Sequence, residues 1–186
     1  MKERCLETEG HDLVCHPDTP ALAVSAVGVR VTGCDEQWLT LRWRIEGAGR
    51  LVVPPLAGRG RADGLWATTC FELFVMRGEP AYAEFNLSPS EQWAAYDFIG
   101  YREGMAGRAM LRDPDCTFRP GTRFALFDAA IPRKALPELP ARIGLSAVIE
   151  EAGGVKSYWA LAHPPGKPDF HAEACFAAKL AATPAT

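Results

Sequence analysis

Short apolar runs, each soon interrupted by proline or glycine, constrain the fold of this chain more than any other feature. The 186 residues include 15 prolines and 17 glycines, and these residues separate runs too short to form long helices. The segment Trp38–Ile45 alternates between apolar and polar side chains with the two-residue period of a half-buried strand. This pattern predicts an all-β sandwich or barrel.

The same reasoning places the individual strands. We expect one short helical turn at Lys134–Leu139 and a long loop at Gly104–Pro120, whereas His171–Leu180 suits either a helix or a strand. Gly153-Gly154 predicts a hairpin turn. No linker divides the chain, so we expect a single domain over residues 1–186. The expected strands are Ala21–Val31, Trp38–Ile45, Leu51–Pro54, Thr69–Met76, Ala81–Ser88, Gln92–Ile99, Arg123–Ile131, Ile143–Glu150 and Lys156–His163.

Charge and composition narrow the classes of partner. The net charge is −3 with acidic and basic residues interspersed, which argues against nucleic acid. No apolar run approaches the roughly 18 residues that span a membrane, and the N-terminus lacks the pattern of a signal peptide, so we expect a cytoplasmic protein. The six scattered cysteines are expected to be reduced and mostly buried; a Cys5–Cys15 disulfide has no positive support.

One predicted strand carries an unusual polar face. Tyr82, Glu84 and Asn86 share one side of Ala81–Ser88, while Ala83, Phe85 and Leu87 share the other. Asparagine is depleted in strands, so Asn86 needs a hydrogen-bonding reason. Two interpretations stay open: a face that holds a polar ligand, or a solvated face of ordinary cross-strand pairs. Nearby side chains that belong to the same group are Trp93, Tyr96, Tyr101 and Arg102.

Trp66 and Glu72 form a second candidate group. Trp66 precedes a predicted strand and Glu72 lies in its middle, where an unpaired buried carboxylate is costly. A sugar uses both features, because its C–H faces pack on rings and its hydroxyls donate to carboxylates. The alternative is that Trp66 plugs the end of the core and Glu72 pairs with an arginine.

A third group surrounds the last predicted strand. It consists of Trp159, His163, Asp169 and His171. The two histidines and Asp169 are suitable metal ligands, but their spacing matches no metal signature, so anchoring of the backbone and ligand contact remain alternatives. A glycosidase would need a carboxylate pair such as Glu72 and Glu84; no nucleophile elbow, P-loop or dinucleotide fingerprint is present.

The segments LW-ATTCFELF, AYAEFNLSPSEQWAAYDFIGYR and SYWALAHPPGKPDFH, taken together, resemble the bacterial DOMON-like domains related to type 9 carbohydrate-binding modules. The resemblance runs from HPDTP near residue 16 to Phe176. It implies an immunoglobulin-like or jelly-roll antiparallel β-sandwich, for which we expect about nine to eleven strands and one short helix.

The same resemblance implies a function. In the sugar-binding modules an aromatic residue and a glutamate six residues later hold the sugar, and Trp66 and Glu72 stand at that spacing. Trp159 matches by position a second aromatic that closes the slot. Known relatives bind sugars or haem; for haem, the available axial ligands are Met76, Met105 or Met110 with His163 or His171.

The sequence therefore predicts a non-enzymatic domain that binds a saccharide or similar polyol, with no cofactor, no metal, no nucleic acid and no membrane. Haem binding and a glycan-active enzyme using Glu72 and Glu84 are the alternatives. The lack of an attached glycanase and of a secretion signal favours a free sugar, an amino sugar or a peptidoglycan precursor over a plant polysaccharide. No pattern indicates a protein partner or an oligomeric state. The predicted ligand-binding residues are Trp66, Glu72, Tyr82, Glu84, Asn86, Trp93, Tyr96, Tyr101, Arg102, Trp159, His163, Asp169 and His171.

Overall fold

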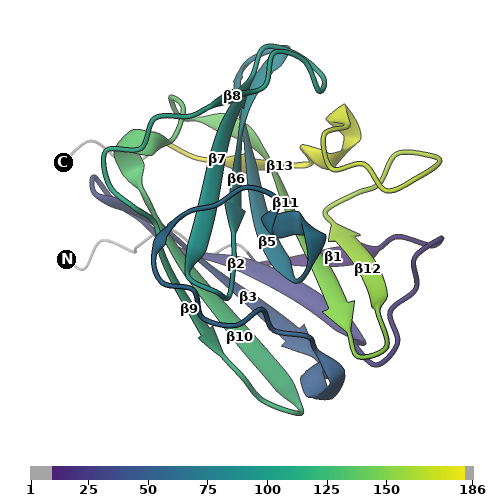
Figure 1. Ribbon diagram of the computed structural model, residues 1–186. Coiled ribbons are helices and arrows are strands. Elements are labelled where there is room, and N and C mark those ends of the chain that lie inside the picture. The colour runs from purple at the N-terminus through teal and green to yellow at the C-terminus, as the bar shows by residue number, and fades with distance from the viewer. Residues whose placement is uncertain (1–9, 183–186) are drawn as a thin grey trace, which may run out of the picture.

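The computed structural model describes residues 10–182, which form two facing layers of β-strands (Figure 1). We call them the β3 sheet and the β6 sheet after their central strands. The β3 sheet runs in the order β1 (Gly10–Cys15), β2 (Ala26–Cys34), β3 (Trp38–Glu46), β10 (Phe124–Pro132) and β9 (Asp115–Arg119). The β6 sheet runs in the order β4 (Gly60–Arg61), β7 (Gln92–Phe98), β6 (Ala81–Leu87), β5 (Cys70–Gly78), β11 (Ala141–Glu151) and β12 (Val155–Ala160).

Strand β1 joins the two sheets, because its first half pairs with β2 and its last two residues pair with β12. Two short strands extend the β6 sheet: β13 (Ala178–Leu180) pairs with β11, and β8 (Ala106–Gly107) pairs with β7. All these pairings are antiparallel except that of β4 with β7. The predicted all-β sandwich of the jelly-roll type is confirmed, and residues 10–182 contain thirteen strands instead of the nine to eleven expected.

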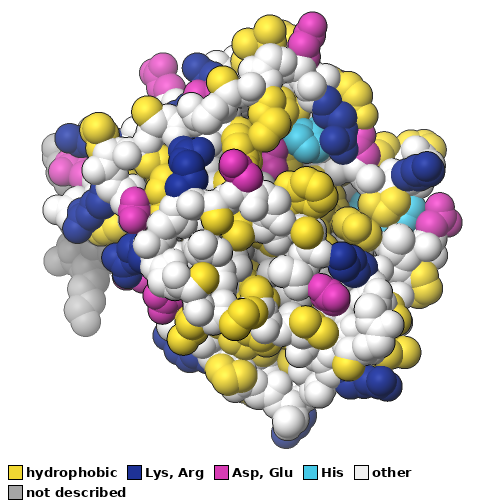
Figure 2. All heavy atoms as spheres, in the orientation of Figure 1, with side chains coloured by type: hydrophobic (Ala, Val, Ile, Leu, Met, Phe, Trp, Pro, Cys, Tyr) yellow, Lys and Arg dark blue, Asp and Glu magenta, His cyan; other side chains and the backbone are white. Residues whose placement is uncertain are grey.

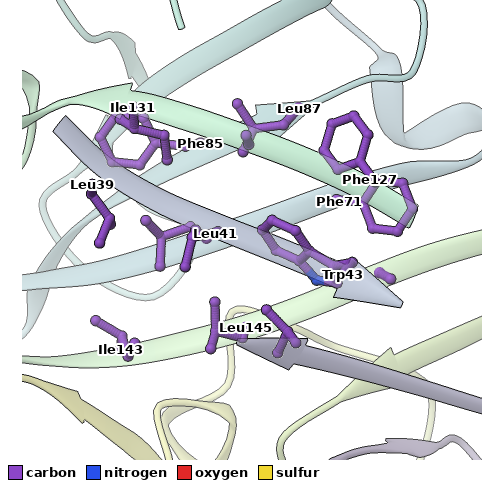
Figure 3. Packing of buried hydrophobic residues seen from close by; sticks show 14 of the residues in the cluster. Leu39, Leu41, Trp43, Phe71, Phe85, Leu87, Phe127, Ile131, Ile143 and Leu145 are labelled. Atoms are coloured by element: carbon purple, nitrogen blue, oxygen red, sulfur yellow. The ribbon is translucent and has the colours of Figure 1, made fainter. Parts of the chain in front are cut away.

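The main core lies between the sheets and is rich in aromatic rings (Figure 3). Phe71 of β5 stacks on Phe127 of β10 with ring centroids 4.3 Å apart, and Trp43 of β3 tilts against both. The inward set predicted for β3 is confirmed, since Leu39, Leu41, Trp43 and Ile45 are all buried. Burial of such side chains is the main favourable term in folding.

The predicted meander of three strands is also confirmed, and it sets the geometry of the site. Strands β5, β6 and β7 are antiparallel neighbours, with Glu72 opposite Asn86 and Glu84 opposite Tyr96. Their inner face, toward the main core, carries residues 71, 73, 75, 83, 85, 87, 93 and 95. Their outer face carries a second apolar cluster that includes residues 70, 74, 82, 94, 96 and 98.

Several predicted elements were wrong. Gly104–Pro120 is not a plain loop, because it contains β8 and β9. Leu51–Pro54 is not a strand: Leu51 makes only an isolated bridge to Glu151. Strand β1 was missed because the polar segment Gly10–Cys15 has little alternation of its own and is held by its partners on both sides.

The helical segments among residues 10–182 are four single 3-10 turns: η1 (Ala48–Arg50), η2 (Leu65–Ala67), η3 (Arg133–Ala135) and η4 (Glu173–Cys175). Turn η3 begins one residue before the predicted helical turn at Lys134–Leu139 and overlaps its first two residues. The open choice for His171–Leu180 resolves into both structures, η4 followed by β13. No helix in this part of the chain has the length and apolarity to cross a membrane.

The cysteines mostly behave as small apolar side chains. Cys70, Cys116 and Cys175 are buried, while Cys15 and Cys34 are partly buried. The Cys5–Cys15 pairing lies partly outside the described residues, since Cys5 precedes residue 10.

Candidate ligand pocket

A pocket of about 420 Å³ opens on the outer face of the β6 sheet. Strands β5, β6, β7, β11 and β12 form its floor, and turn η2 and the loops around residues 102 and 170 form its walls. Figure 2 shows this face of the molecule, on which histidine, acidic and basic side chains gather beside hydrophobic ones. The lining residues are Trp66, Glu72, Glu84, Tyr96, Phe98, Arg102, Met105, Val148, Tyr158, Pro168, Phe170 and His171.

Two buried carboxyl groups lie on the floor of this pocket. Glu72 is 3 % exposed and Glu84 is 6 % exposed. Because Glu72 pairs with Asn86, it is a diagonal neighbour of Glu84 on the same face, at a typical separation of about 7–8 Å. The Ser146 hydroxyl donates a hydrogen bond to Glu72 Oε2 over 3.2 Å. The alternative in which Glu72 pairs with an arginine is therefore wrong.

Burial makes both carboxyl groups hold their protons unusually tightly. Loss of solvent raises the pKa of Glu84 to about 7. Burial, followed by the negative charge of Glu84, raises the pKa of Glu72 well above its usual range. Such shifts arise because a low-dielectric environment disfavours the charged form of an acid. The floor of the pocket therefore carries two acids whose pKa values are raised by burial, that of Glu84 to about 7.

His171 faces the pair from the wall. Its Nε2 lies 3.8 Å from Glu84 Oε2, and its Nδ1 lies 2.7 Å from the Tyr82 hydroxyl. That hydroxyl also accepts the backbone N–H of Arg102 over 3.2 Å, so we assign the proton of the Tyr82–His171 bond to Tyr82, which leaves the imidazole proton on Nε2. Burial, followed by the charge of Arg102, lowers the pKa of His171 to about 4. The ring is therefore neutral at physiological pH.

Asp169 holds the wall together. It accepts the Arg102 guanidinium over 2.8 Å, the Tyr101 hydroxyl, and the backbone N–H of His171 over 3.1 Å. Burial opposes its ionisation, but the bonds from Tyr101 and Arg102 outweigh burial and lower the pKa of Asp169. Arg102 thus forms its ion pair with Asp169.

Trp66 stands at the rim with 56 % of its surface exposed, so it does not plug the core. The turn that carries it is anchored at both ends. On one side the Tyr96 hydroxyl donates to Asp63 over 2.5 Å, and on the other the Lys156 ammonium donates to the carbonyl of Ala67. Gly64, with φ of 73°, begins the turn in the left-handed region that favours glycine.

A wider groove of about 790 Å³ adjoins the pocket. Tyr82, Tyr101 and Asp169 line this groove, and Arg102 and His171 line both spaces. The remaining wall is formed largely by the loop that contains Pro164, Pro165 and Pro168. The structure thus places nine of the thirteen predicted residues around these two adjoining spaces, and the other four lie elsewhere. The nine are Trp66, Glu72, Tyr82, Glu84, Tyr96, Tyr101, Arg102, Asp169 and His171.

Two predicted tryptophans belong to the main core instead. Trp93 and Trp159 are each 5 % exposed and face inward. Trp93 and Tyr96 are three residues apart on β7, so their side chains point to opposite faces of the sheet. The Trp159 indole N–H donates to Ser157 Oγ over 2.9 Å. The prediction that Trp159 closes the slot is wrong for this reason; its outward neighbour Tyr158 lines the pocket.

His163 and Asn86 also lie outside the pocket lining. His163 Nε2 lies 2.8 Å from the carbonyl of Val14, and the ring packs edge-on against His16, which matches the anchoring alternative. Asn86 lies on the outer face beside Glu72 but is fully buried. Its amide is near enough to Glu84 to lower the pKa of that acid slightly against the effect of burial, yet neither polar atom has a partner with hydrogen-bond geometry.

Sequence reasoning missed several lining residues. Phe98 shares the parity of Tyr96 and Ser146 interrupts an apolar strand, so both carried a local signal. Tyr158 and Phe170, whose ring centroids lie 6.0 Å apart, meet only because a loop folds back over β12. Met105 lies in a loop with no periodic pattern.

The predicted metal ligands do not form a cluster. Within residues 10–182 no group of three His, Cys, Asp or Glu side chains is arranged to hold a metal ion. Asp169 and His171 are neighbours, but His163 hydrogen-bonds elsewhere.

Comparison with known proteins places the fold. A scan against protein-family models finds no match, and no curated protein sequence matches the chain significantly. Among solved structures, a carbohydrate-binding protein candidate from Bacteroides uniformis superposes with a TM-score of 0.61 at 17 % identity, over 90 % of this chain and 84 % of that one. A family 9 carbohydrate-binding module from Caldicellulosiruptor kristjanssonii, in complex with cellotriose, superposes with a TM-score of 0.51 at 11 % identity, over 86 % and 75 %. The chain has the fold of these proteins.

Proposed function

We propose that this protein is a non-enzymatic saccharide-binding domain of the DOMON-like, type 9 module kind, and that the sugar lies in the 420 Å³ pocket between Trp66 and the floor of the β6 sheet. The observation that carries the proposal is the pairing of an exposed ring with two buried carboxyl groups in one pocket. The volume lies within the range of about 300–1,000 Å³ that is usual for small-molecule sites.

The walls of the pocket suit the apolar side of a sugar ring. Trp66, Tyr158 and Phe170 present aromatic surface from three different segments of the chain. Covering about 100 Å² of apolar surface on one indole would contribute roughly 2–3 kcal/mol. The fold neighbours, a carbohydrate-binding candidate and a module complexed with cellotriose, support a saccharide as the ligand.

The floor suits the hydroxyl groups. A carboxylate accepts hydrogen bonds and a protonated carboxyl group also donates one, and burial favours the protonated form of both Glu72 and Glu84. The imidazole N–H of His171 adds a neutral donor beside Glu84. A ring of hydroxyl groups, each both donor and acceptor, matches such a mixed set better than an apolar ligand does.

A fluorescence titration tests the proposal. Glucose, N-acetylglucosamine, glucosamine and cellobiose are titrated into the wild type and into Trp66→Ala while tryptophan emission is followed. At least one sugar is expected to bind the wild type, and the loss of a stacking ring should weaken it by about tenfold or more.

The matched control is Trp38→Ala, because Trp38 lies at the start of β3 on the other sheet and its ring contacts Arg112. This variant should bind as the wild type does. Absence of binding by every sugar, or unchanged binding by Trp66→Ala, would contradict the proposal, and steady turnover of a glycoside that stops in Glu84→Gln would contradict its non-enzymatic part.

Haem is the second candidate, favoured by one observation: Met105 and His171 line the same pocket. Methionine and histidine are a known axial pair. Added haemin should then give a shifted Soret band that disappears in Met105→Leu, whereas an unshifted band would remove this candidate.

A further inference from the structure

We infer that the preferred ligand of this pocket carries a protonated amine, and that its ammonium group lies between Glu72 and Glu84 beneath the aromatic rim. The inference rests on the proposed function and names the chemical class of the sugar: an amino sugar rather than a neutral one.

The carboxyl oxygens of Glu72 and Glu84 leave most of their hydrogen-bond acceptor positions unused. Each carboxylate offers about four lone-pair positions, yet the only hydrogen bond formed with either acid within the described residues comes from Ser146 to Glu72. The polar groups near Glu84 include His171 Nε2 at 3.8 Å and the Asn86 amide, and neither forms a hydrogen bond of good geometry with it. Buried polar groups are normally satisfied, so these acids are built for a partner that supplies donors.

Three hydroxyl and guanidinium donors that line the pocket and the adjoining groove are engaged elsewhere. The Tyr96 hydroxyl donates to Asp63, and the Tyr101 hydroxyl and the Arg102 guanidinium donate to Asp169. The protein therefore leaves the acceptors open to a ligand.

The charged side chains that line the pocket are the two glutamates and Arg102, beside the neutral His171, and Arg102 forms its ion pair with Asp169. Within the described residues no lysine or arginine forms an ion pair with either glutamate. An ammonium has three donors and no acceptor, and it is also attracted to the faces of aromatic rings, which Trp66, Tyr158 and Phe170 provide around the rim.

The buried Asn86 amide supplies an independent observation. It is fully buried beside Glu72, and both its nitrogen and its oxygen lack a hydrogen-bond partner. An orphaned amide next to two nearly unpartnered acids indicates a polar network that a ligand completes.

The inference predicts a dependence on pH. Burial keeps a proton on Glu84 up to about pH 7, and an ammonium that enters must displace a proton from the pair. Below pH 7 the affinity for an amine should therefore fall by about tenfold per pH unit for each proton displaced. Over pH 5.5–7 the protonation states of His171 and Asp169 do not change, since His171 titrates near pH 4 and Asp169 stays ionised.

The titratable or charged groups that surround the two glutamates come from every element packed against them. They are Cys70 on β5, Tyr82 on β6, Tyr96 on β7, Lys156 and Tyr158 on β12, and Arg102, Asp169 and His171 on the covering loops.

Calorimetric titration with glucosamine, glucose, N-acetylglucosamine and cyclohexylamine at pH 7.0 and 5.5 provides the test. Glucosamine should bind at least about tenfold more tightly than glucose at pH 7.0, and this advantage should shrink at pH 5.5. N-acetylglucosamine, which lacks the charge, should behave as glucose does. Glu84→Gln, which keeps the shape but cannot ionise, should bind glucosamine and glucose alike.

The matched control is Glu36→Gln, an exposed residue in the turn between β2 and β3; it should keep the glucosamine preference. Equal binding of glucosamine and glucose by the wild type would overturn the inference and leave the proposed function intact. Binding of cyclohexylamine and glucosamine with similar affinity, with no binding of any neutral sugar, would support the ammonium site and overturn the saccharide proposal. A glucosamine preference that persists in both Glu84→Gln and Glu72→Gln would overturn the inference as well.

Discussion

The two faces of the β5–β6–β7 meander are made by the same strands but obey different rules. The inner face is a continuous apolar surface whose rings stack against β3 and β10 (Figure 3). The outer face alternates rings with acids and an amide, and short loops cover it (Figure 1). The inner face is stabilised by packing alone, whereas the stability of the outer face depends on the polar partner of each acid and amide.

Stability and the proposed binding therefore depend on neighbouring residues whose side chains point to opposite faces of the sheet. Phe71 and Glu72 are adjacent in sequence and both are buried. Removing the first leaves a void in a close-packed core, while neutralising the second relieves a cost of burying an acid. Three measurements separate the faces, and they are given in order of decreasing expected effect.

The largest effect is expected on the inner face. Phe71→Ala removes a ring stacked on Phe127 and should lower the free energy of unfolding by about 3–5 kcal/mol, as measured by urea denaturation. Leu111→Ala is the control, since Leu111 is 94 % exposed, and it should change the value by less than about 0.5 kcal/mol. Similar losses in the two variants would show that the inner face is not the centre of stability.

On the outer face a substitution is expected to change the free energy of unfolding by less, and to raise it instead of lowering it. The pKa of Glu84 is raised from 4.5 to about 7 in the folded protein, so the unfolded chain releases this proton first as pH rises. The contribution of Glu84 to the free energy of unfolding is thus fully present below pH 4.5, and it falls by about 3 kcal/mol as the pH rises through 7. Glu84→Gln should gain this amount relative to wild type between pH 4.5 and pH 8 in urea denaturation.

His171 acts in the reverse direction. Its pKa is lowered from 6.5 to about 4, so its contribution rises with pH between those values, and it offsets the loss from Glu84 in the wild type over much of that range. The comparison of Glu84→Gln with wild type cancels the histidine contribution. Parallel stability curves for the two proteins would show that Glu84 ionises normally.

The smallest effect is expected where the outer face meets its loops. Asp169→Asn weakens the bonds from Arg102 and Tyr101 and should cost about 1 kcal/mol of stability. It should also weaken ligand binding, because the loop that carries His171 is less firmly placed. Asp115→Asn, which breaks the exposed Arg59 pair, is the control and should cost less than about 0.5 kcal/mol; equal effects would show that Asp169 has no special positioning role.

Much of the fold follows from local alternation. Strand β3 and the meander were predictable because each has a two-residue period with strong apolar positions. Trp66 and Glu72 stand at the spacing that the resemblance to type 9 modules implies, and they line one pocket. Strands β1 and β9 were not, since their pairing with neighbours decides their structure more than their own pattern does.

The remaining site residues depend on contacts between distant segments. Nothing near Tyr158 in sequence indicates that Phe170 will fold back beside it. Trp93 is predicted on the ligand face from its residue type and Trp159 from its position in the family resemblance, although the phase of each strand turns both inward. Phase relative to a known core position is therefore a better guide than the kind of side chain.

The strict separation of the two faces has a practical consequence for protein engineering. Along residues 70–98 the even positions of β5, β6 and β7 face outward and the odd positions face the main core. A combinatorial library restricted to positions 72, 84, 96 and 98 would vary the chemistry of the pocket while every ring of the main core is kept. The fold thus provides a scaffold in which new ligand preferences can be selected without a search for compensating core mutations.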